Sequence, residues 1–423
     1  MSPRINHRTV IIGAGITGMT AAYQLLRDGY DGEVYIFESN GQCSGRLQSV
    51  RVPDSDDVIE LGAGRFHIGR HAALNQLRLE LGLEVQPFNF PASYGGMATG
   101  RSPEDGAEEF RRLLGRLEAS LAGSREARFA EFAATVLGKE GLRRLVALTG
   151  YDTLANTALP VAGGMSILKD HPEGQSYVTR ETAQWFSIKG GFQSLLTELE
   201  QRLADRVQLH YKTTVGAITA LPEPECGYQL SVSSEGVENT ICCDAIVVAT
   251  PPQGAQGIGG LARSSRLESL KSVESVPLLK GFCRFRTPWW RNKVGGGRCV
   301  INSTPLRKVY LSERGNLLWF YCDGESALRT SRILEFDERA ILGLLEDHLG
   351  CRVPSDTVLE DFTWKMWRQG ISFLRSEKTG TDKFREVSNK VVVCSDIYTE
   401  HVGWLEGGLL SAQAGTQYLA HRM

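Results

Sequence analysis

Residues 9–18 read TVIIGAGITG, and this stretch decides the fold. Residues 9–12 form a continuous apolar run, which is typical of a strand buried on both faces of a sheet. Gly13, Gly15 and Gly18 follow with the spacing G-x-G-x-x-G, and residues 19–27 then predict a helix. The first glycine permits a tight turn, the second lets the backbone approach a pyrophosphate, and the third lets helix and strand pack closely. The chain therefore opens on a predicted dinucleotide-binding βαβ unit.

An acidic residue completes this pattern. Glu38 ends a second predicted strand, residues 33–38, and lies 20 residues after Gly18. A carboxylate in that place can accept hydrogen bonds from ribose hydroxyls, and the helix N-terminus offers N–H groups and partial positive charge to phosphates. The glycines and the acid are compatible with NAD and with FAD alike.

Four later motifs favour FAD. The sequence Ser44-Gly45-Arg46 follows the second strand, and Arg46 can place its guanidinium on a phosphate or near a flavin edge. Residues 245–252 (AIVVATPP) predict a buried strand that ends in a turn, and residues 390–394 predict another strand with Asp396 just beyond it, where an acid can bind ribitol hydroxyls. Residues 403–408 (GWLEGG) open a predicted closing helix whose N-terminus can stabilise an anionic flavin.

Composition excludes several other classes of protein. The chain has 423 residues, 42% of them hydrophobic, and a formal net charge of -2, which argues against a nucleic-acid partner. Its nine cysteines form no C-x-x-C pair and their number is odd, so a metal cage or a disulfide framework is not expected and a reducing cytoplasm is. No apolar run reaches the ~18 residues of a membrane span, and the first strand leaves no room before it for a signal peptide.

The pattern of elements predicts a mixed α/β fold with discontinuous domains. We expect a Rossmann-like FAD-binding domain over 1–70, 205–260 and 385–423, because the two ends of the chain both carry cofactor motifs. A mixed-sheet substrate-binding domain is expected over 71–100, 150–204 and 261–384. Residues 101–149 are rich in Glu, Arg, Leu and Ala and predict an inserted helical segment, with helices over 107–122 and 125–149.

The order of these motifs resembles the flavin amine oxidase superfamily, which includes L-amino acid, monoamine and polyamine oxidases. Within it, several stretches of the chain resemble the bacterial L-tryptophan oxidases of the violacein pathway. The stretches that carry this resemblance are 59–65 (IELGAGR), 150–154 (GYDTL), 171–176 (HPEGQS), 184–186 (QWF), 278–282 (LLKGF), 288–290 (PWW), 305–310 (PLRKVY) and 394–412. One position departs from the family: Ser44 stands where two glycines usually precede the arginine.

The motifs and the resemblance together assign the site. The resemblance implies that Arg65 and Tyr321 hold a substrate carboxylate and that Lys280 acts beside the flavin, with Tyr151, His171, Asp323 and Trp404 lining the substrate pocket. The predicted contacts of a non-covalent FAD are Gly13, Gly15, Ile16, Thr17, Gly18, Glu38, Ser39, Gly45, Arg46, Gly62, Ala63, Gly64, Arg65, Val215, Ala249, Thr250, Pro251, Trp367, Asp396, Gly403, Trp404 and Leu405. No metal is expected.

The residues themselves indicate what chemistry to expect. Arginine binds a carboxylate through two parallel hydrogen bonds, and a lysine such as Lys280 in an apolar run is unusual because lysines are rarely buried. The prediction is an FAD-dependent L-amino acid oxidase that uses O₂ and yields H₂O₂, with aromatic substrates and L-tryptophan first. The alternatives are an amine or polyamine oxidase, a dehydrogenase with another electron acceptor, and a flavin-binding scaffold without turnover. A homodimer and a downstream enzyme that takes the imine stay open as partners.

Overall fold

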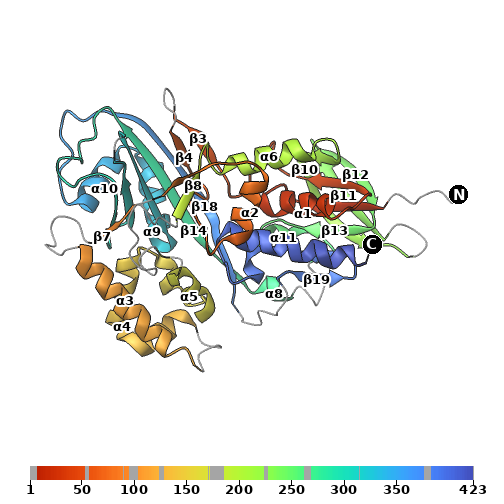
Figure 1. The fold of residues 1–423 in the computed structure, drawn as a ribbon, viewed down its shortest axis with the longest axis horizontal. Coiled ribbons are helices and arrows are strands. Elements are labelled where there is room, and N and C mark those ends of the chain that lie inside the picture. The colour runs from red at the N-terminus through yellow and green to blue at the C-terminus, as the bar shows by residue number, and fades with distance from the viewer. Residues whose placement is uncertain are drawn as a thin grey trace. The chain divides into compact units, whose positions relative to one another are not determined.

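The computed structural model describes residues 7–52, 57–88, 90–94, 103–122, 128–169, 171, 185–222, 227–261, 268–313, 315–375 and 383–422 (Figure 1). The chain forms two compact units, each assembled from separate segments. Unit 1 comprises Met1–Gln86, Ser187–Val273 and Lys378–Met423, and unit 2 comprises Pro87–Phe186 and Glu274–Glu377. The predicted mixed α/β fold is confirmed.

The centre of unit 1 is a six-stranded sheet with the order β19-β20-β13-β1-β2-β9. Strands β1, β2, β9, β13 and β20 pair in parallel, and β19 pairs antiparallel with β20. Its inner strands are mostly apolar, as the sequence predicted, because both faces are covered. The bounds are β1 Arg8–Ile12, β2 Glu33–Phe37, β9 Val207–His210, β13 Ala245–Val248, β19 Arg385–Ser388 and β20 Val391–Val393.

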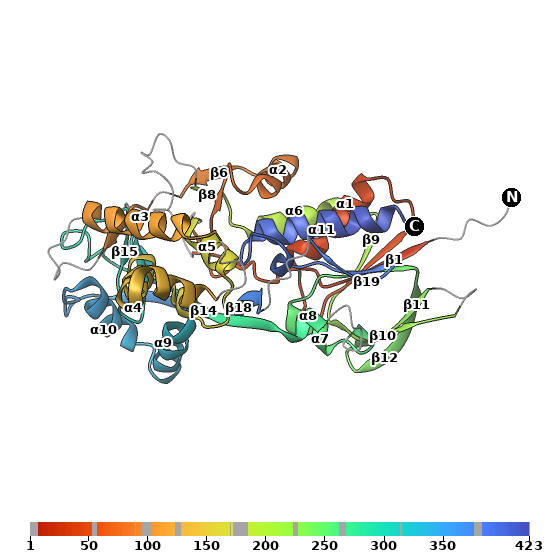
Figure 2. The same cartoon turned by 90° about the horizontal axis from the view of Figure 1, so that it is seen from below.

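Helices and a smaller sheet form the two layers beside this sheet. Figure 2 shows α1, α6 and α11 on one face and the three-stranded sheet β10-β11-β12 on the other. The bounds are α1 Ile16–Arg27, α2 Ala72–Glu80, α6 Gln193–Leu203, α7 Pro252–Gly257, α8 Glu268–Lys271, α11 Leu405–Ala420, η7 Asp396–Tyr398, β3 Ser49–Arg51, β4 Val58–Glu60, β5 Phe66–His67, β6 Val85–Pro87, β8 Trp185–Ile188, β10 Thr213–Ala220, β11 Tyr228–Ser234 and β12 Val237–Cys243.

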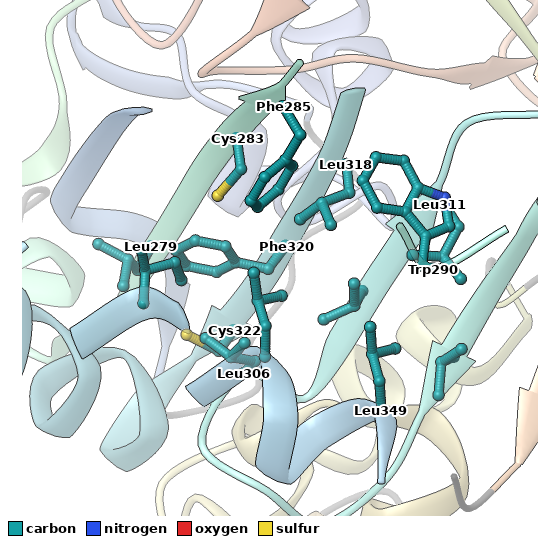
Figure 3. Close-up of a cluster of buried hydrophobic side chains, with 14 of the residues drawn as sticks. Leu279, Cys283, Phe285, Trp290, Leu306, Leu311, Leu318, Phe320, Cys322 and Leu349 are labelled. Carbon is teal, nitrogen blue, oxygen red and sulfur yellow. The ribbon is translucent and has the colours of Figure 1, made fainter. Parts of the chain in front are cut away.

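Unit 2 contains a mixed six-stranded sheet with the order β18-β14-β17-β16-β15-β7. One of its faces carries the hydrophobic core, in which Leu279, Phe285 and Phe320 from the strands pack with Leu349 from α10 (Figure 3). The bounds are β7 Ala92–Tyr94, α3 Pro103–Ala119, α4 Phe129–Thr149, η2 Asp152–Ala155, α5 Val161–Lys169, β14 Val273–Phe285, β15 Arg298–Ile301, β16 Lys308–Leu311, β17 Leu317–Asp323, α9 Gly324–Phe336, α10 Ala340–Leu349 and β18 Leu359–Leu374.

The unit boundaries differ from the predicted domain boundaries. Four stretches that were expected in a substrate-binding domain belong to unit 1, namely residues 71–86, 187–204, 261–273 and 378–384. The physical reason is that α6 packs against α1, while Glu406 of α11 accepts hydrogen bonds from the first turn of α2. The helical segment lies within unit 2, where α3 contacts β7 and α4 contacts β15. Two helices occur there as predicted, although Gly138 interrupts α4 with a φ of +80°.

Candidate active site

The glycine turn of unit 1 contains two glycines that its backbone conformation requires and one that it does not require. Gly13 has a φ of +104°, and a Cβ on Gly18 would lie 1.9 Å from the carbonyl oxygen of Gly13, so a side chain at either position strains the turn. A Cβ on Gly15 would meet only the Cα of Gly45, at an ordinary 3.7 Å. The fold therefore tolerates a side chain at Gly15, and its absence leaves room for a ligand to approach the backbone.

Glu38 lies at the edge of this turn. Its Oε2 accepts the Ala14 N–H at 2.8 Å, and its Oε1 accepts the Asn40 backbone N–H at 2.8 Å and the Asn40 side-chain amide at 2.6 Å. The side chain is 6% exposed. The backbone thus fixes the carboxylate beside the glycines, and its contact with a ribose stays a prediction.

Motifs from opposite ends of the chain meet at Arg46. Its guanidinium donates to Asp396 Oδ1 at 2.7 Å, a contact that spans 350 residues of sequence. Asp396 Oδ2 accepts the Gly403 N–H at 2.9 Å, just before α11. A Cβ on Gly62 would lie 2.1 Å from the Arg46 carbonyl oxygen, so the IELGAGR stretch packs against the same residue. The structure therefore brings together the motifs that the sequence assigned to one cofactor site.

Two further predicted contacts belong to β10 and to the turn after β13. Val215 is buried and pairs with Val232 of β11. The Thr250 hydroxyl is buried and has no hydrogen-bond partner among the described residues. A buried hydroxyl of this kind ordinarily has a partner, so Thr250 is suited to hydrogen-bond a ligand.

Arg65 lies next to an aromatic side chain. Its guanidinium carbon is 6.0 Å from the ring centroid of Trp404, the residue that precedes α11. Trp404 also contacts His71, whose ring centroid is 4.7 Å away. Burial, together with the nearby His401 and His67, lowers the pKa of His71 to about 3, so this ring is neutral at pH 7. Arg65 is thus the charged member of this group.

In unit 2, the register of β14 and β17 decides which way Lys280 points. Lys280 pairs directly with Tyr321, while the neighbouring Leu279, Phe320 and Cys322 are fully buried in the hydrophobic core. Since side chains alternate along a strand, Lys280 and Tyr321 share the opposite face of the sheet. Burial and the charge of Asp323 raise the pKa of Tyr321 well above its usual value, so its phenol stays protonated and able to donate.

Aromatic rings surround Tyr321. Tyr151, just after α4, meets it edge-on with centroids 5.7 Å apart, and His171 meets Tyr151 edge-on at 6.0 Å. His171 also lies 5.1 Å from Phe110 of α3. Tyr151, His171 and Tyr321, which the resemblance placed in one pocket, therefore form one cluster within unit 2.

On strands β14, β17 and β16, the next row along this face of the sheet consists of aromatic residues. Phe282, Trp319 and Tyr310 lie side by side on β14, β17 and β16, and their rings stack with centroids 5.7 and 5.5 Å apart. Phe90 meets Trp319 edge-on at 5.0 Å. Sequence reasoning did not single out this row, although the alternation within LLWFYC could have indicated it.

Asp323 has a structural task that the sequence did not reveal. Its Oδ1 accepts the Asp152 N–H at 2.7 Å, and its Oδ2 accepts the Thr153 hydroxyl at 2.5 Å, so it caps the η2 turn that carries Tyr151. The side chain is fully buried, and this burial raises its pKa to about 6. Its place in a substrate pocket stays a prediction.

Lys308 belongs to the same cluster, and sequence reasoning missed it. Its Nζ lies 3.1 Å from the ring centroid of Tyr151 and 5.2 Å from that of Tyr321. Lys308 begins the otherwise apolar strand KVYL, and a lysine among apolar residues is the same pattern that indicated a role for Lys280. Trp367, on β18, has the ammonium of Lys365 5.1 Å above its ring, and its flavin contact stays a prediction.

The predicted residues divide between the two units. Unit 2 holds Lys280, Tyr321, Tyr151, His171, Asp323 and Trp367, and unit 1 holds the others. Of the HPEGQS and QWF stretches, only His171, Trp185 and Phe186 lie among the described residues. The described part of the chain contains no cluster of His, Cys, Asp and Glu suited to a metal and no helix with the length and apolar character of a bilayer span.

Comparison with known proteins now identifies the family. The profile of the flavin containing amine oxidoreductases matches residues 16–413. The chain belongs to this family. Membership of this family implies a flavin cofactor, and Gly15, Glu38 and the Thr250 hydroxyl in unit 1 fit a flavin dinucleotide.

Individual relatives are distant. The L-amino-acid oxidase of Sistrurus catenatus edwardsii is 22% identical over 336 residues, which cover 72% of this chain and 62% of that protein. Aplysianin-A of Aplysia kurodai is 39% identical, over 18% of this chain and 13% of its own. The chain therefore matches less than two thirds of the length of these relatives. Among solved structures, cyclohexylamine oxidase from Brevibacterium oxydans IH-35A has a TM-score of 0.75 at 18% identity, with 99% of each chain covered.

Proposed function

We propose that this flavin amine oxidoreductase is an FAD-dependent L-amino acid oxidase with a preference for aromatic substrates, L-tryptophan first. The Cα–H of the substrate leaves with two electrons, the amine loses a proton, and a C=N bond forms. Two electrons and two protons convert O₂ to H₂O₂. When bound, FAD carries the electrons between the two half-reactions.

The observation that carries this proposal is the guanidinium of Arg65 at 6.0 Å from the ring of Trp404. Arginine is the side chain best suited to bind a carboxylate bidentately. An amine substrate without a carboxylate gives no reason for a cation there, whereas an amino acid does. The aromatic neighbour is compatible with a substrate that has a planar side chain.

Unit 2 supports the same proposal with residues of complementary chemistry. Tyr321 keeps its phenol proton and can donate a hydrogen bond to a carboxylate, and Lys280 shares its face of the sheet. The row of Phe282, Trp319 and Tyr310 adds flat apolar surface on that face. We assign Lys280 to positioning, proton transfer and the reduction of O₂, and Tyr321 to the substrate carboxylate.

A peroxide-coupled assay of the purified protein against all twenty L-amino acids tests the proposal, with putrescine and cyclohexylamine as comparison substrates. We expect H₂O₂ with aromatic L-amino acids, most of all with L-tryptophan. Turnover of the amines alone would establish an amine oxidase instead. Turnover of L-tryptophan only with an artificial electron acceptor would establish a dehydrogenase, and a flavin that no substrate reduces would indicate a scaffold.

A further inference from the structure

Lys308 is one of the least exposed charged side chains in the described structure. Its relative exposure is 2%, at the first position of β16. Burial removes water from an ammonium group, so a lysine in such a place needs other groups to stabilise its charge. Two aromatic faces do so here: the Nζ lies 3.1 Å from the ring centroid of Tyr151 and 5.2 Å from that of Tyr321.

The backbone around Lys308 is built to admit this side chain. In the sheet, Lys308 pairs directly with Tyr321, which in turn pairs with Lys280, so a phenol lies between two lysines in one row. Gly150, which ends α4 with a φ of +63°, lies against the lysine stem: a Cβ there would come within 2.9 Å of Lys308 Cε and Cγ. The C-terminal end of α4, which is followed by Tyr151, thus packs against the Lys308 side chain.

Lys308 also interacts with a buried carboxyl group. The positive charge of Lys308 lowers the pKa of Asp323, which opposes the effect of burial on that carboxyl. Asp323 in turn holds the backbone and hydroxyl of the residues that follow Tyr151. Lys308 therefore contacts the rings of both tyrosines directly. It is also linked to Tyr151 indirectly, through the Asp323 carboxylate that caps the turn after Tyr151.

We propose that Lys308 is a positioning residue that holds the rings of Tyr151 and Tyr321 in the orientation in which their phenols meet the substrate. This inference rests on the proposed function for the part that the two phenols play. Lys308 reaches the ring faces, so its effect on a substrate is indirect. It differs in this from Lys280, which we assign to the reaction with O₂.

The test compares Lys308→Met, which keeps the length of the stem and removes the charge, with Lys308→Arg, which keeps a cation able to stack on aromatic rings. Lys293→Met serves as a control, because Lys293 lies in the same unit and its Nζ binds only the Arg352 carbonyl oxygen among the described contacts. The probe is indole-3-acetate, which has the carboxylate and the indole but no amine to oxidise. Its binding to the flavin-loaded protein is followed by the change in flavin absorbance.

We expect Lys308→Met to bind indole-3-acetate about tenfold more weakly, with Lys308→Arg recovering most of the affinity. The near-ultraviolet circular dichroism of tyrosine should also change in Lys308→Met and not in Lys293→Met. If folded Lys308→Met keeps both the affinity and the tyrosine signal, or if Lys308→Arg resembles Lys308→Met, the positioning role is wrong.

A second variant covers the case in which Lys308→Met does not fold. Tyr151→Leu removes the nearer ring, and Lys308→Gln, which removes the charge but keeps a polar side chain, should then change affinity less in that background than in the wild type. Equal effects in both backgrounds would overturn the inference. Failure of the proposed function looks different: the wild type itself binds no indole-3-acetate and oxidises no L-amino acid, while the circular dichroism change still reports whether Lys308 holds the rings.

Discussion

In the proposed oxidase, the charge of Arg65 distinguishes an amino acid substrate from a simple amine. Arg65→Ala removes a charge-assisted contact worth roughly 2–5 kcal/mol, so kcat/KM on L-tryptophan should fall about a hundredfold or more. Steady-state peroxide assays measure this, and the flavin content should be unchanged. Arg78→Ala on α2, whose guanidinium binds Asn75 and the Leu83 carbonyl oxygen, is the control. A KM close to that of the wild type would mean that another residue holds the carboxylate.

The role proposed for Lys280 distinguishes an oxidase, which reduces O₂, from a dehydrogenase, which passes its electrons to another acceptor. Negative charge develops on oxygen as O₂ is reduced, and a nearby ammonium stabilises it. In Lys280→Met, rapid anaerobic mixing with L-tryptophan should still bleach the flavin absorbance, while its return in air should slow by about tenfold or more. Lys293→Met should alter neither phase. Two unchanged phases in Lys280→Met would give this lysine a structural role only.

Asp323 should make stability depend on pH in an unusual direction. Its pKa is about 6 in the folded protein, above the ~3.9 of an unfolded aspartate, so the folded state binds this proton more tightly. The contribution is fully present below pH ~3.9 and is lost as the pH rises through about 6.

The measurement is urea unfolding at pH 4 and pH 7. Between these values the wild type should lose on the order of 2–3 kcal/mol relative to Asp323→Asn, which cannot titrate. The exposed Asp356→Asn should follow the wild type. Parallel pH profiles for the wild type and Asp323→Asn would show that the carboxyl titrates as it does in the unfolded chain.

At the scale of elements, Glu406 in the closing motif GWLEGG has a structural role that the sequence did not reveal. Glu406 is 2% exposed and accepts the N–H groups of Ala73 and Leu74, both at 2.9 Å. These are among the first donors of α2, which have no partner within their own helix. One acid of α11 thus holds the start of a helix more than 330 residues away, close to His71 and Trp404.

Glu406→Gln should therefore destabilise the fold. The amide keeps one acceptor but turns its NH₂ toward a backbone donor, which costs about 1–3 kcal/mol. The decrease should appear in urea unfolding, and Glu335→Gln at the exposed end of α9 should show none. Equal stability of the two variants would show that another acceptor, such as water, replaces the carboxylate.

Sequence periodicity was sufficient to predict the strands that are buried on both faces and the helices that follow a glycine motif. The strands β1, β2, β13 and β20 and the helices α1 and α11 lie within a few residues of their predicted positions. The helix α9 was missed because GESALRTSRILEF carries many polar residues and directly follows a strand. The contacts of Lys308 with two tyrosines could not be predicted, because they depend on the register of β16 and β17 and on the left-handed Gly150.

At the scale of the whole molecule, unit 1 is complete only when three segments of the chain have come together. Its central sheet joins β1 and β2 to β9 and β13 from the middle of the sequence and to β20 near its end. The ion pair between Arg46 and Asp396 also joins the N-terminal segment to the C-terminal segment. Since these segments also carry the cofactor motifs, a bound flavin dinucleotide should stabilise the assembled unit by mass action, by about 2.7 kcal/mol at a hundred times its Kd.

This coupling leads to a prediction about how the cofactor is held. We expect a yellow protein that releases all of its FAD on denaturation, because the binding motifs supply hydrogen bonds and charge. Gly15→Ala should fold like the wild type in the absence of FAD, since the added methyl meets only an ordinary contact at 3.7 Å, yet bind FAD much more weakly. Gly18→Ala should impair folding itself, because its methyl collides with the Gly13 carbonyl oxygen.

Thermal unfolding with and without added FAD, together with the absorbance of the supernatant after denaturation, distinguishes these cases. The control is Gly343→Ala in α10, where an added Cβ meets nothing within 4 Å and alanine favours the helix. Flavin that stays with the denatured chain would show a covalent link. If Gly15→Ala gains as much thermal stability from FAD as the wild type does, the glycine turn is not the place where the dinucleotide approaches the backbone, and the assignment of unit 1 as the cofactor domain loses its main support.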